Sequence, residues 1–292
     1  MARVCHLTQG AALGYVVLPL RGVQLASFDT PSTHPLTHPS HKSTHTIKIM
    51  IKEAIKQYQS SHGFDHFDPK CVLFDMDGVL YDSMRNHAAA WQEAMAQFDL
   101  HFTAADSYAT EGARGVDTIR HFVRQQQGRE IDETEAQRMY DVKADLFHRM
   151  PTAEIFPGVL DIMQKIQSSG LTIGVVTGSG QRPLIKRLLS DFQGFLTEDH
   201  IVSAYDVQRG KPNPDPYLMG LRKTGNYEPW QGIVVENAPL GVRAGSAANI
   251  FTVGINSGPL PDSALSDNGA NIVLQRMTEL CGLWSDILAE RN

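Results

Sequence analysis

The sequence predicts an α/β fold, a Rossmann-like parallel-sheet core interrupted by an all-helical segment. Two observations predict this fold. Beyond residue 151, short apolar segments alternate with helical segments, which is typical of a parallel sheet covered on both faces. Between residues 83 and 150 the apolar spacing is helical only, so the alternation is interrupted just after its first strand.

Composition and charge narrow the possible partners. The 26 basic and 32 acidic residues give a formal net charge of −6, which argues against a nucleic-acid-binding surface. Cys5, Cys71 and Cys281 lie far apart and show neither a disulfide framework nor zinc-site spacing. No apolar run approaches the roughly 20 residues that cross a bilayer. We expect a cytoplasmic protein without nucleic-acid or membrane partners, acting as a monomer or a homodimer.

Residues 1–49 differ in composition from the rest of the chain. The stretch from Pro31 to His45 consists mostly of Pro, Ser, Thr and His, which bury too little apolar surface to fold. We predict that residues 1–49 are a disordered extension or a mis-assigned start, with the true start at Met50. The apolar run from Ala11 to Leu20 leaves a secretory signal open as an alternative, and a functional tail is a third.

The ordered elements are expected from Met50 onward. A short helical pattern covers residues 51–59, and the first strand is the apolar run Lys70–Phe74. Three long helical segments without proline follow, at Met84–Phe98, Val116–Arg124 and Glu133–Met150. Five more strands are predicted at Leu171–Val176, His200–Ala204, Gly232–Glu236, Ile250–Gly254 and Asn271–Leu274, with helices starting near Val159, Pro183, Asp215, Leu240 and Met277. The predicted core domain therefore comprises residues 50–82 and 155–292, and residues 83–154 form an inserted helical domain.

Polar residues follow four of the predicted strands. In open parallel sheets, ligands bind beyond the carboxyl ends of the strands, so these residues are expected to converge at one edge. They are Asp75 and Asp77, then Thr177, Gly178 and Ser179, then Lys211, and finally Glu236 and Asn237. Each group alone is weak evidence, because polar strand ends are common. The four together predict one site.

The residue types suit phosphoryl transfer. A phosphorus centre surrounded by anionic oxygens needs cations and one well-aimed nucleophile. Asp75 is the candidate nucleophile, forming an aspartyl-phosphate. Asp77 is placed to protonate the leaving oxygen and then to deprotonate the attacking water. A neighbouring like charge and partial burial are expected to raise the pKa of Asp77.

Two further residues are expected to hold the phosphoryl group. Thr177 can donate its hydroxyl, while Gly178 lets backbone N–H groups approach and the helix near Pro183 points its positive end at the same anion. Lys211 is followed by prolines at 212, 214 and 216, which hold it in a rigid loop. Lys211 is therefore the expected countercharge for Asp75.

A magnesium site is predicted beside the nucleophile. Glu236 and Asn237 supply oxygen atoms that, with the Asp75 carboxylate and the Asp77 carbonyl, match the preference of Mg²⁺ for hard ligands. A neutral amide is a weak ligand, so two alternatives stay open for Asn237. It either binds the metal through water or caps the helix at Pro239–Leu240.

The ordered motifs DMDGV, TGS, GKPNPDPY and VVENAPLGV resemble the haloacid dehalogenase (HAD) superfamily of phosphohydrolases over residues 70–288. The run FDMDGVL, followed by Asp82-Ser83, His87 and Trp91, resembles the β-phosphoglucomutase-like subfamily, whose helical cap follows the first motif. Glu111-Gly112, TGSGQ and VENAPLGV are similar to a Bacteroides-type branch that includes inorganic pyrophosphatase. The sequence departs from the common pattern at residue 237, where a second acid often stands.

The resemblance implies that residues 83–154 are a cap that supplies substrate specificity. It implies that His87, Glu111 and Lys143 lie on the cap side of the substrate, with Arg114 and Gln181 behind them. In the pyrophosphatase branch a cap glutamate at the position of Glu111 helps to exclude larger organic substrates. In the mutase pattern an arginine grips the distal phosphate, and Arg114 is displaced from that place by about one position.

Three functions remain open from the sequence. The first is a Mg²⁺-dependent phosphohydrolase acting on a small phosphorylated substrate, with inorganic pyrophosphate favoured and a sugar phosphate possible. The second is a β-phosphoglucomutase, which transfers phosphoryl between C1 and C6 of glucose phosphate. The third is a non-catalytic phosphate-binding scaffold, against which the intact set Asp75, Asp77, Thr177 and Lys211 argues.

Overall fold

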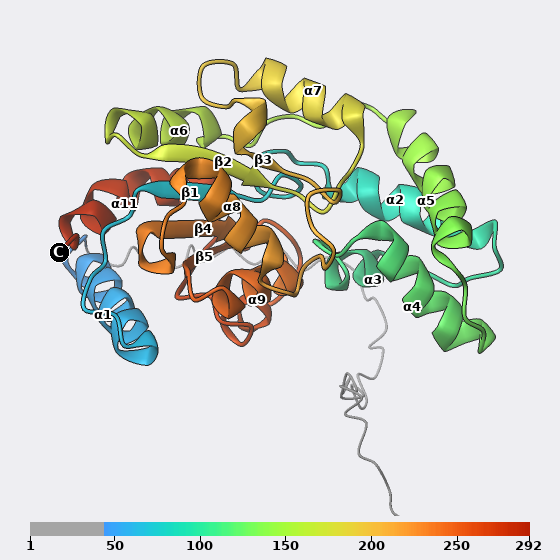
Figure 1. The fold of residues 1–292 in the computed structure, drawn as a ribbon, viewed down its shortest axis with the longest axis horizontal. Helices are drawn as coiled ribbons and strands as arrows, with labels where there is room; N and C mark the ends of the chain where they lie inside the picture. The colour runs from blue at the N-terminus through green and yellow to red at the C-terminus, as the bar shows by residue number, and fades with distance from the viewer. Residues whose placement is uncertain (1–43) are drawn as a thin grey trace, which may run out of the picture. The chain divides into compact units, whose positions relative to one another are not determined.

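The computed structural model describes residues 44–292, with side chains described from Lys48 onward. A six-stranded parallel sheet forms the centre, in the order β3-β2-β1-β4-β5-β6 (Figure 1). The strands are β1 (Cys71–Phe74), β2 (Thr172–Val176), β3 (Ile201–Val202), β4 (Gly232–Glu236), β5 (Phe251–Ile255) and β6 (Ile272–Leu274). The predicted α/β fold with a parallel sheet is confirmed. The interpretation of residues 1–49 falls largely outside the described residues.

Helices cover both faces of the sheet. One face packs against α1 (Thr44–His62), α6 (Val159–Ser168), α7 (Arg182–Asp191) and α11 (Met277–Ala289), and the other against α8 (Asp215–Gly225) and α9 (Pro239–Ala247). The short helix α10 (Ser263–Ser266) and the 3₁₀ turns η1 (Glu198–His200) and η2 (Pro229–Gln231) complete the core.

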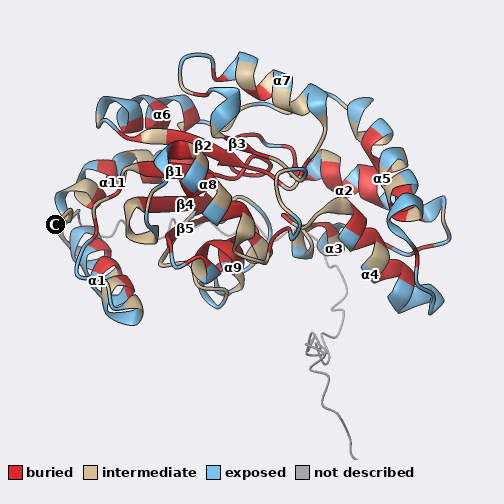
Figure 2. Ribbon diagram, viewed as in Figure 1, coloured by how far each residue is buried: buried red, intermediate tan, exposed pale blue. Residues whose placement is uncertain are grey.

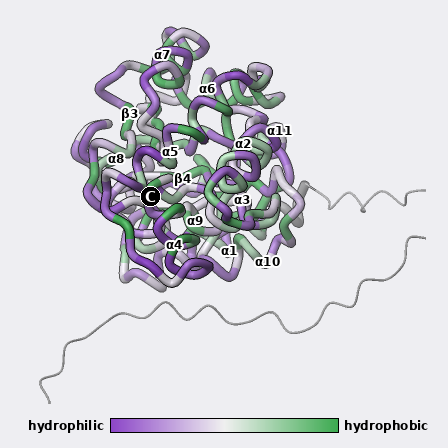
Figure 3. The backbone as a smooth tube through the Cα atoms, turned by 90° about the vertical axis from the view of Figure 1, so that its right-hand side faces the viewer, coloured by the Kyte–Doolittle hydropathy of each residue, from purple (hydrophilic) through white to green (hydrophobic). Residues whose placement is uncertain are grey.

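Burial on both faces explains the strand sequences. Val72 and Phe74 of β1 face one apolar cluster, while Cys71 and Leu73 face the other. A strand enclosed in this way needs apolar residues at every position rather than at alternate ones. Figure 2 shows the central strands buried along most of their lengths, and Figure 3 shows hydrophilic residues spread over outer helices such as α4 and α7. Among the described helices, none is long and apolar enough to span a membrane.

Helix α1 begins earlier than the pattern at residues 51–59 indicates and is anchored in the core. Ile51, Ile55 and Tyr58 are buried and lie one turn apart along the helix. The Tyr58 hydroxyl donates a hydrogen bond of 2.9 Å to the carbonyl oxygen of Asn249. Helix α1 is therefore an integral part of the apolar cluster on its face of the sheet.

Four helices lie in the chain between β1 and β2, ahead of α6. They are α2 (Met84–Ala96), α3 (Ala104–Ala109), α4 (Gly115–Gln127) and α5 (Glu133–His148), and we call them the helical insertion. They pack around their own apolar cluster, which includes Trp91, Phe102, Ile119 and Phe122. The two chain segments that connect the insertion to the sheet run side by side, since the Asp82 N–H donates to the Glu154 carbonyl oxygen at 2.9 Å.

The helix ends in the insertion follow local signals. Helix α4 ends at Gln127, three residues beyond the end that the apolar spacing predicts. Gly128 follows it in the left-handed conformation, with φ of 67°. The glutamines at 125–127 extend the helix without contributing to the apolar pattern. Helix α3 was not predicted. It starts with a capping box, in which Thr103 and Asp106 satisfy each other's backbone N–H groups.

Candidate active site

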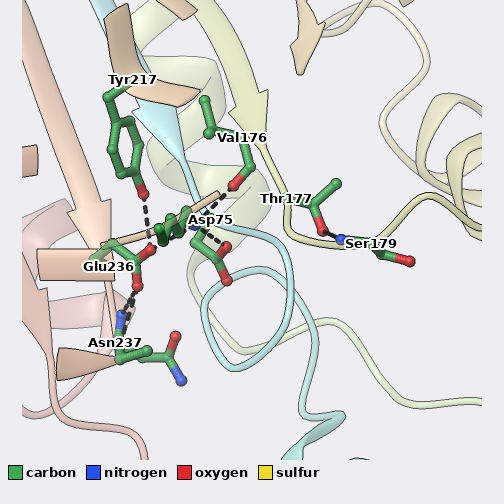
Figure 4. Close-up of polar contacts among 9 residues, drawn as sticks. Asp75, Val176, Thr177, Ser179, Tyr217, Glu236 and Asn237 are labelled. Atoms are coloured by element: carbon green, nitrogen blue, oxygen red, sulfur yellow. Dashed lines mark hydrogen bonds and ion pairs between the residues drawn. The ribbon is translucent and has the colours of Figure 1, made fainter. Parts of the chain in front are cut away.

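Asp75 directly follows β1 and lies beside the end of β4. Its backbone N–H donates to the Val235 carbonyl oxygen at 3.0 Å, which extends the strand pairing into the loop. The chain then turns through Gly78, whose φ of 82° favours glycine. Figure 4 shows Glu236 and Asn237 next to Asp75 at these strand ends. The predicted convergence of the first and fourth strand ends is present in the structure.

Lys211 lies between the two strand ends. Its Nζ is 2.5 Å from Asp75 Oδ1, 2.6 Å from Glu236 Oε1 and 3.0 Å from the Val176 carbonyl oxygen. All three side chains are buried. Burial alone lowers the pKa of Lys211, but the two carboxylates outweigh this effect and raise the pKa above its usual value. Lys211 is therefore a fixed cation at the carboxyl edge of the sheet.

Glu236, which we predicted as a metal ligand, has both carboxylate oxygens occupied. Oε1 accepts hydrogen bonds from Lys211 and from the Tyr217 hydroxyl at 2.8 Å. Oε2 accepts from the backbone N–H groups of Asn237 and Ala238, at 2.9 and 3.1 Å. Gly241 makes room for this carboxylate, because a Cβ there would lie 1.7 Å from Oε1. In this arrangement Glu236 holds Lys211 in place.

The loop after β2 brings Thr177 and Gly178 to the same edge. The Ser179 N–H donates to Thr177 Oγ1 at 3.0 Å. Helix α7 begins at Arg182, with Pro183 in its first turn, so its N-terminus follows this loop closely. Gly178 touches the helical insertion, because a Cβ at this residue would lie 2.8 Å from the Gly112 carbonyl oxygen. The loop therefore lies between the sheet and the insertion.

A series of close polar contacts connects Asp77 to the insertion. Asp77 Oδ1 accepts from the Ser83 hydroxyl at 2.6 Å and lies 3.0 Å from His87 Nε2. On the other side of the ring, Lys143 Nζ lies 2.7 Å from His87 Nδ1. An ammonium group can only donate, so Nδ1 accepts and Nε2 carries the proton that faces Asp77. Burial and the neighbouring Lys143 lower the pKa of His87, which keeps the ring neutral.

The expectation that the pKa of Asp77 is raised is wrong. Burial acts in that direction, but His87, Ser83 and Lys143 outweigh it and lower the pKa to about 2. At this site, the carboxyl groups with a raised pKa are those of Asp75 and Glu111. Burial raises the pKa of Asp75 to about 8 against the opposing charge of Lys211. Burial and the nearby Asp77 and Asp75 raise the pKa of Glu111 well above its usual value.

These groups surround a small cavity of about 40 Å³, room for only a few water molecules. Its sheet side is formed by Asp75, Asp77, Thr177, Gly178 and Ser179. From the insertion come Glu111, His87 and Lys143, as predicted, together with Trp91, Thr110, Thr118 and Tyr140. The cavity therefore has walls from both parts of the fold.

Five predicted site residues lie outside the lining of this cavity: Lys211, which is described above, Arg114, Gln181, Glu236 and Asn237. Arg114 bonds to the Gln208 carbonyl oxygen at 2.7 Å and to Glu133 at 2.8 Å. Gln181 bonds to the Tyr140 hydroxyl. Glu236 and Asn237 lie beneath it, at the end of β4. Asn237 does not cap α9, whose first turn has no side-chain cap, so that alternative is wrong.

Besides the lining residues Trp91, Thr110 and Thr118, three residues that bond to side chains of the site were not predicted: Ser83, Tyr140 and Tyr217. Ser83 directly precedes α2, where its residue type indicates a helix start rather than a partner of Asp77. Tyr140 lies in an amphipathic helix, and Tyr217 follows the Lys211 loop in the motif GKPNPDPY. Sequence spacing alone assigns both tyrosines to the packing of a helix face.

The donor set fits a magnesium ion. Asp75 Oδ2 and Asn237 Oδ1 are buried without a hydrogen-bond partner among the described residues. Both are hard oxygen ligands of the kind that Mg²⁺ prefers. In the described part of the chain, no three His, Cys, Asp or Glu side chains form a metal cluster by themselves. A metal here would therefore depend on the Asn237 amide and on backbone oxygen as well as on carboxylate.

Residues 72–255 match the family model described as haloacid dehalogenase-like hydrolase. Among curated relatives, validoxylamine A 7'-phosphate phosphatase of Streptomyces hygroscopicus subsp. limoneus is 30% identical over 212 residues, 72% of this chain and 95% of the relative. Hexitol phosphatase A of Escherichia coli is 28% identical over 72% of this chain and 93% of the relative. Beta-phosphoglucomutase of Bacillus subtilis is 25% identical over 72% of this chain and 91% of the relative.

A solved structure resembles the chain over a greater length. It is described as "Putative beta-phosphoglucomutase from Bacteroides vulgatus" and is 44% identical, with a TM-score of 0.79. The match covers 83% of this chain and 98% of that structure. The likeness thus includes the sheet, the helical insertion and the site that joins them.

Proposed function

The chain belongs to the haloacid dehalogenase-like hydrolases and is a phosphatase or phosphoglucomutase-like enzyme. We propose that it is a Mg²⁺-dependent phosphohydrolase that acts on inorganic pyrophosphate. The small size of the cavity between the sheet and the insertion carries this proposal. A space of about 40 Å³ is far below the roughly 300 Å³ at which pockets for drug-sized ligands begin. Any phosphorylated substrate would require the insertion to withdraw, and a hexose phosphate would require a larger displacement than pyrophosphate.

The proposed reaction begins at Asp75. Its carboxylate attacks phosphorus, and the bond to the leaving oxygen breaks, which leaves an aspartyl-phosphate. Lys211 holds Asp75 in place and offsets negative charge on the transferred group, while Thr177 and the N–H groups near Gly178 and Ser179 bind its oxygens. Water then attacks the aspartyl-phosphate and regenerates Asp75.

Asp77 is the proposed acid and base. A carboxyl whose pKa is about 2 is ionised at neutral pH, so Asp77 can accept the proton of the attacking water, although as a weak base. Phosphate leaves as a stable anion and needs little protonation, whereas the alkoxide of a sugar needs a proton. The leaving group of pyrophosphate therefore requires less of an acid at Asp77 than the leaving group of a sugar phosphate would.

Magnesium would be held by Asp75, the Asp77 carbonyl and Asn237, with Glu236 behind them, and it would offset the charge of the phosphate oxygens. The unpartnered oxygens of Asp75 and Asn237 support this assignment. The burial of Asp75 and Glu111 is consistent with it, because burial raises the pKa of both carboxyls and a nearby cation would offset that cost.

The helical insertion, residues 83–154, is the proposed cap. Its contacts with the loop after β2 close the cavity over Asp75, and His87, Glu111 and Lys143 present its polar groups to the substrate. Glu111 would repel an anion on its own, but beside a divalent cation it completes the closed site and leaves no room for an organic leaving group.

A β-phosphoglucomutase is the alternative. The observation that favours it is the 44% identity to the Bacteroides vulgatus structure described above. A mutase retains the phosphoryl group on the enzyme until the sugar reorients. Conversion of β-glucose 1-phosphate to glucose 6-phosphate by the purified protein therefore distinguishes it from a hydrolase.

The test is phosphate release with Mg²⁺ from pyrophosphate, hexose phosphates and phosphoglycolate, with the Asp75→Asn variant as the matched control. We expect pyrophosphate to give the highest kcat/KM and the variant to lose at least about 1000-fold in rate. Faster release from a hexose phosphate than from pyrophosphate would reject the substrate. Equal rates for the variant and the wild type would reject Asp75 as the nucleophile.

A further inference from the structure

Tyr140 of helix α5 forms a direct hydrogen bond to the loop after β2. Its hydroxyl oxygen accepts from Gln181 Nε2 at 3.1 Å. Gln181 precedes α7, and its backbone N–H donates to Ser179 Oγ at 3.3 Å. The Ser179 N–H in turn donates to Thr177 Oγ1. A continuous series of hydrogen bonds therefore runs from the helical insertion to the residue that follows β2.

The Tyr140 ring has a fixed position. Gly115 leaves space for it, because a Cβ at residue 115 would lie 2.1 Å from the ring. The Trp91 ring lies 6.1 Å away, and Lys143 Nζ lies 5.9 Å from the centre of the tyrosine ring. Burial raises the pKa of Tyr140, against the hydrogen-bonding neighbours Gln181 and Ser179, so the hydroxyl stays neutral. The hydroxyl is held at the cavity wall rather than free to rotate into solvent.

Other polar contacts join the two parts, such as Arg114 to the Gln208 carbonyl oxygen and His87 to Asp77, but this one ends on the loop after β2. The backbone at Gly112 touches Gly178 through van der Waals contact, which tolerates small displacements. A hydrogen bond depends steeply on distance and angle, so the Tyr140–Gln181 bond forms only when α5 lies fully against the loop. Opening of the cap by more than about 1 Å would break it.

We propose that Tyr140 is a positioning residue that couples closure of the cap to the arrangement of residues 177–181. The proposal rests on the proposed function, in which this loop binds the transferred phosphoryl group. When the cap closes, Tyr140 fixes Gln181, and Gln181 fixes the Ser179 hydroxyl. The loop is then ordered for binding only while water is excluded from the cavity.

The kinetic test uses Tyr140→Phe, which removes the hydroxyl and keeps the ring. We expect kcat/KM for pyrophosphate to fall about threefold to tenfold, the contribution of one hydrogen bond, with KM changing more than kcat. Tyr108→Phe is the matched control, since Tyr108 also belongs to the insertion but packs against Gly258 on the other side. Equal kinetics for the two variants would overturn the proposal.

A double-mutant cycle identifies the route of the effect. Gln181→Met removes the partner of Tyr140 and keeps the length of the side chain. If Tyr140 acts through Gln181, the double variant loses no more activity than Gln181→Met alone. Additive losses would show that Tyr140 acts on the substrate directly and would overturn the positioning role.

Hydrogen exchange separates this proposal from the proposed function, because it needs no turnover. The amides of residues 177–181 are measured in the wild type, Tyr140→Phe and Tyr108→Phe, each with Mg²⁺ and inorganic phosphate. We expect exchange in this loop to be about threefold to tenfold faster in Tyr140→Phe and unchanged in Tyr108→Phe. Unchanged exchange in Tyr140→Phe rejects the coupling even if the enzyme hydrolyses pyrophosphate, and faster exchange supports it even if no substrate is hydrolysed.

Discussion

The ammonium group of Lys211 lies 2.6 Å from Oε1 of Glu236, and both side chains are almost completely buried. Asp75 shares the same ammonium at 2.5 Å. A buried cation between two carboxylates is stable only while its partners keep their charge. Glu236 therefore acts on Asp75, the proposed nucleophile, through the position of Lys211.

Replacing Glu236 by Gln is expected to destabilise the fold by about 3 kcal/mol, because it removes one partner of a buried ion pair and disturbs three other donors. The measurement is the free energy of unfolding in urea. Glu130→Gln is the control, since Glu130 pairs with Arg124 on the exposed surface and its loss should change stability far less. Equal effects of the two changes would show that the buried pair contributes little.

Gly178→Ala should lower activity more than stability. Its new methyl group would lie 2.8 Å from the Gly112 carbonyl oxygen and 3.0 Å from that of Ala113, so the cap cannot close fully. We expect kcat/KM to fall by at least about 100-fold, since a displacement of about 1 Å has that effect in closed sites. Gly282→Ala in α11, where nothing lies within 4 Å, should leave activity unchanged. The measurements are phosphate release and melting temperature for both variants, and equal activity of the two would contradict the prediction.

Lys143 predicts a pH dependence of stability. Burial lowers its pKa from 10.5 to about 8 in the folded protein. Between pH 8 and pH 10.5 the unfolded chain binds more protons than the folded protein, so the free energy of unfolding rises with pH in this range. Relative to Lys143→Met, the wild type should gain about 2 kcal/mol between pH 8 and pH 9.5. Urea unfolding of both proteins at the two pH values tests this, and a difference that stays constant contradicts it.

Asn237→Ala should weaken the use of Mg²⁺. Loss of the amide oxygen is expected to raise the Mg²⁺ concentration for half-maximal activity by about 10-fold. Removal of the metal with EDTA should abolish phosphate release by the wild type, and added Mg²⁺ should restore it. Asn268→Ala, which removes a side chain that bonds to Ala264 in the core, serves as the control. A Mg²⁺ dependence that matches the wild type would remove Asn237 from the metal site.

The parts of the site that could be predicted are those fixed by local chain order. Asp75, Thr177 and Glu236 each follow or end an apolar strand, and parallel strands bring such positions together whatever the loops do. His87, Glu111 and Lys143 were placed by resemblance rather than by spacing. Nothing in the helical pattern alone distinguishes them from residues on an exposed helix face.

The parts that could not be predicted depend on distances across the fold. Spacing shows that Glu236 ends a strand, but not that four donors surround its carboxylate. The pKa of Asp77 has the opposite shift from the one expected, because His87 and Lys143 reach it from helices α2 and α5. Arg114 points to Gln208 and Glu133, a choice set by loop geometry that no local signal records.

The bond between the Asp82 N–H and the Glu154 carbonyl oxygen places the entrance and exit of the helical insertion next to each other. The insertion also has an apolar cluster of its own. A related helical module with the same spacing between its ends can therefore be grafted at these two junctions while the sheet keeps its pairing. Recombination at residues 82 and 154 offers a way to build chimaeric enzymes in which selectivity is exchanged and the catalytic scaffold is inherited intact.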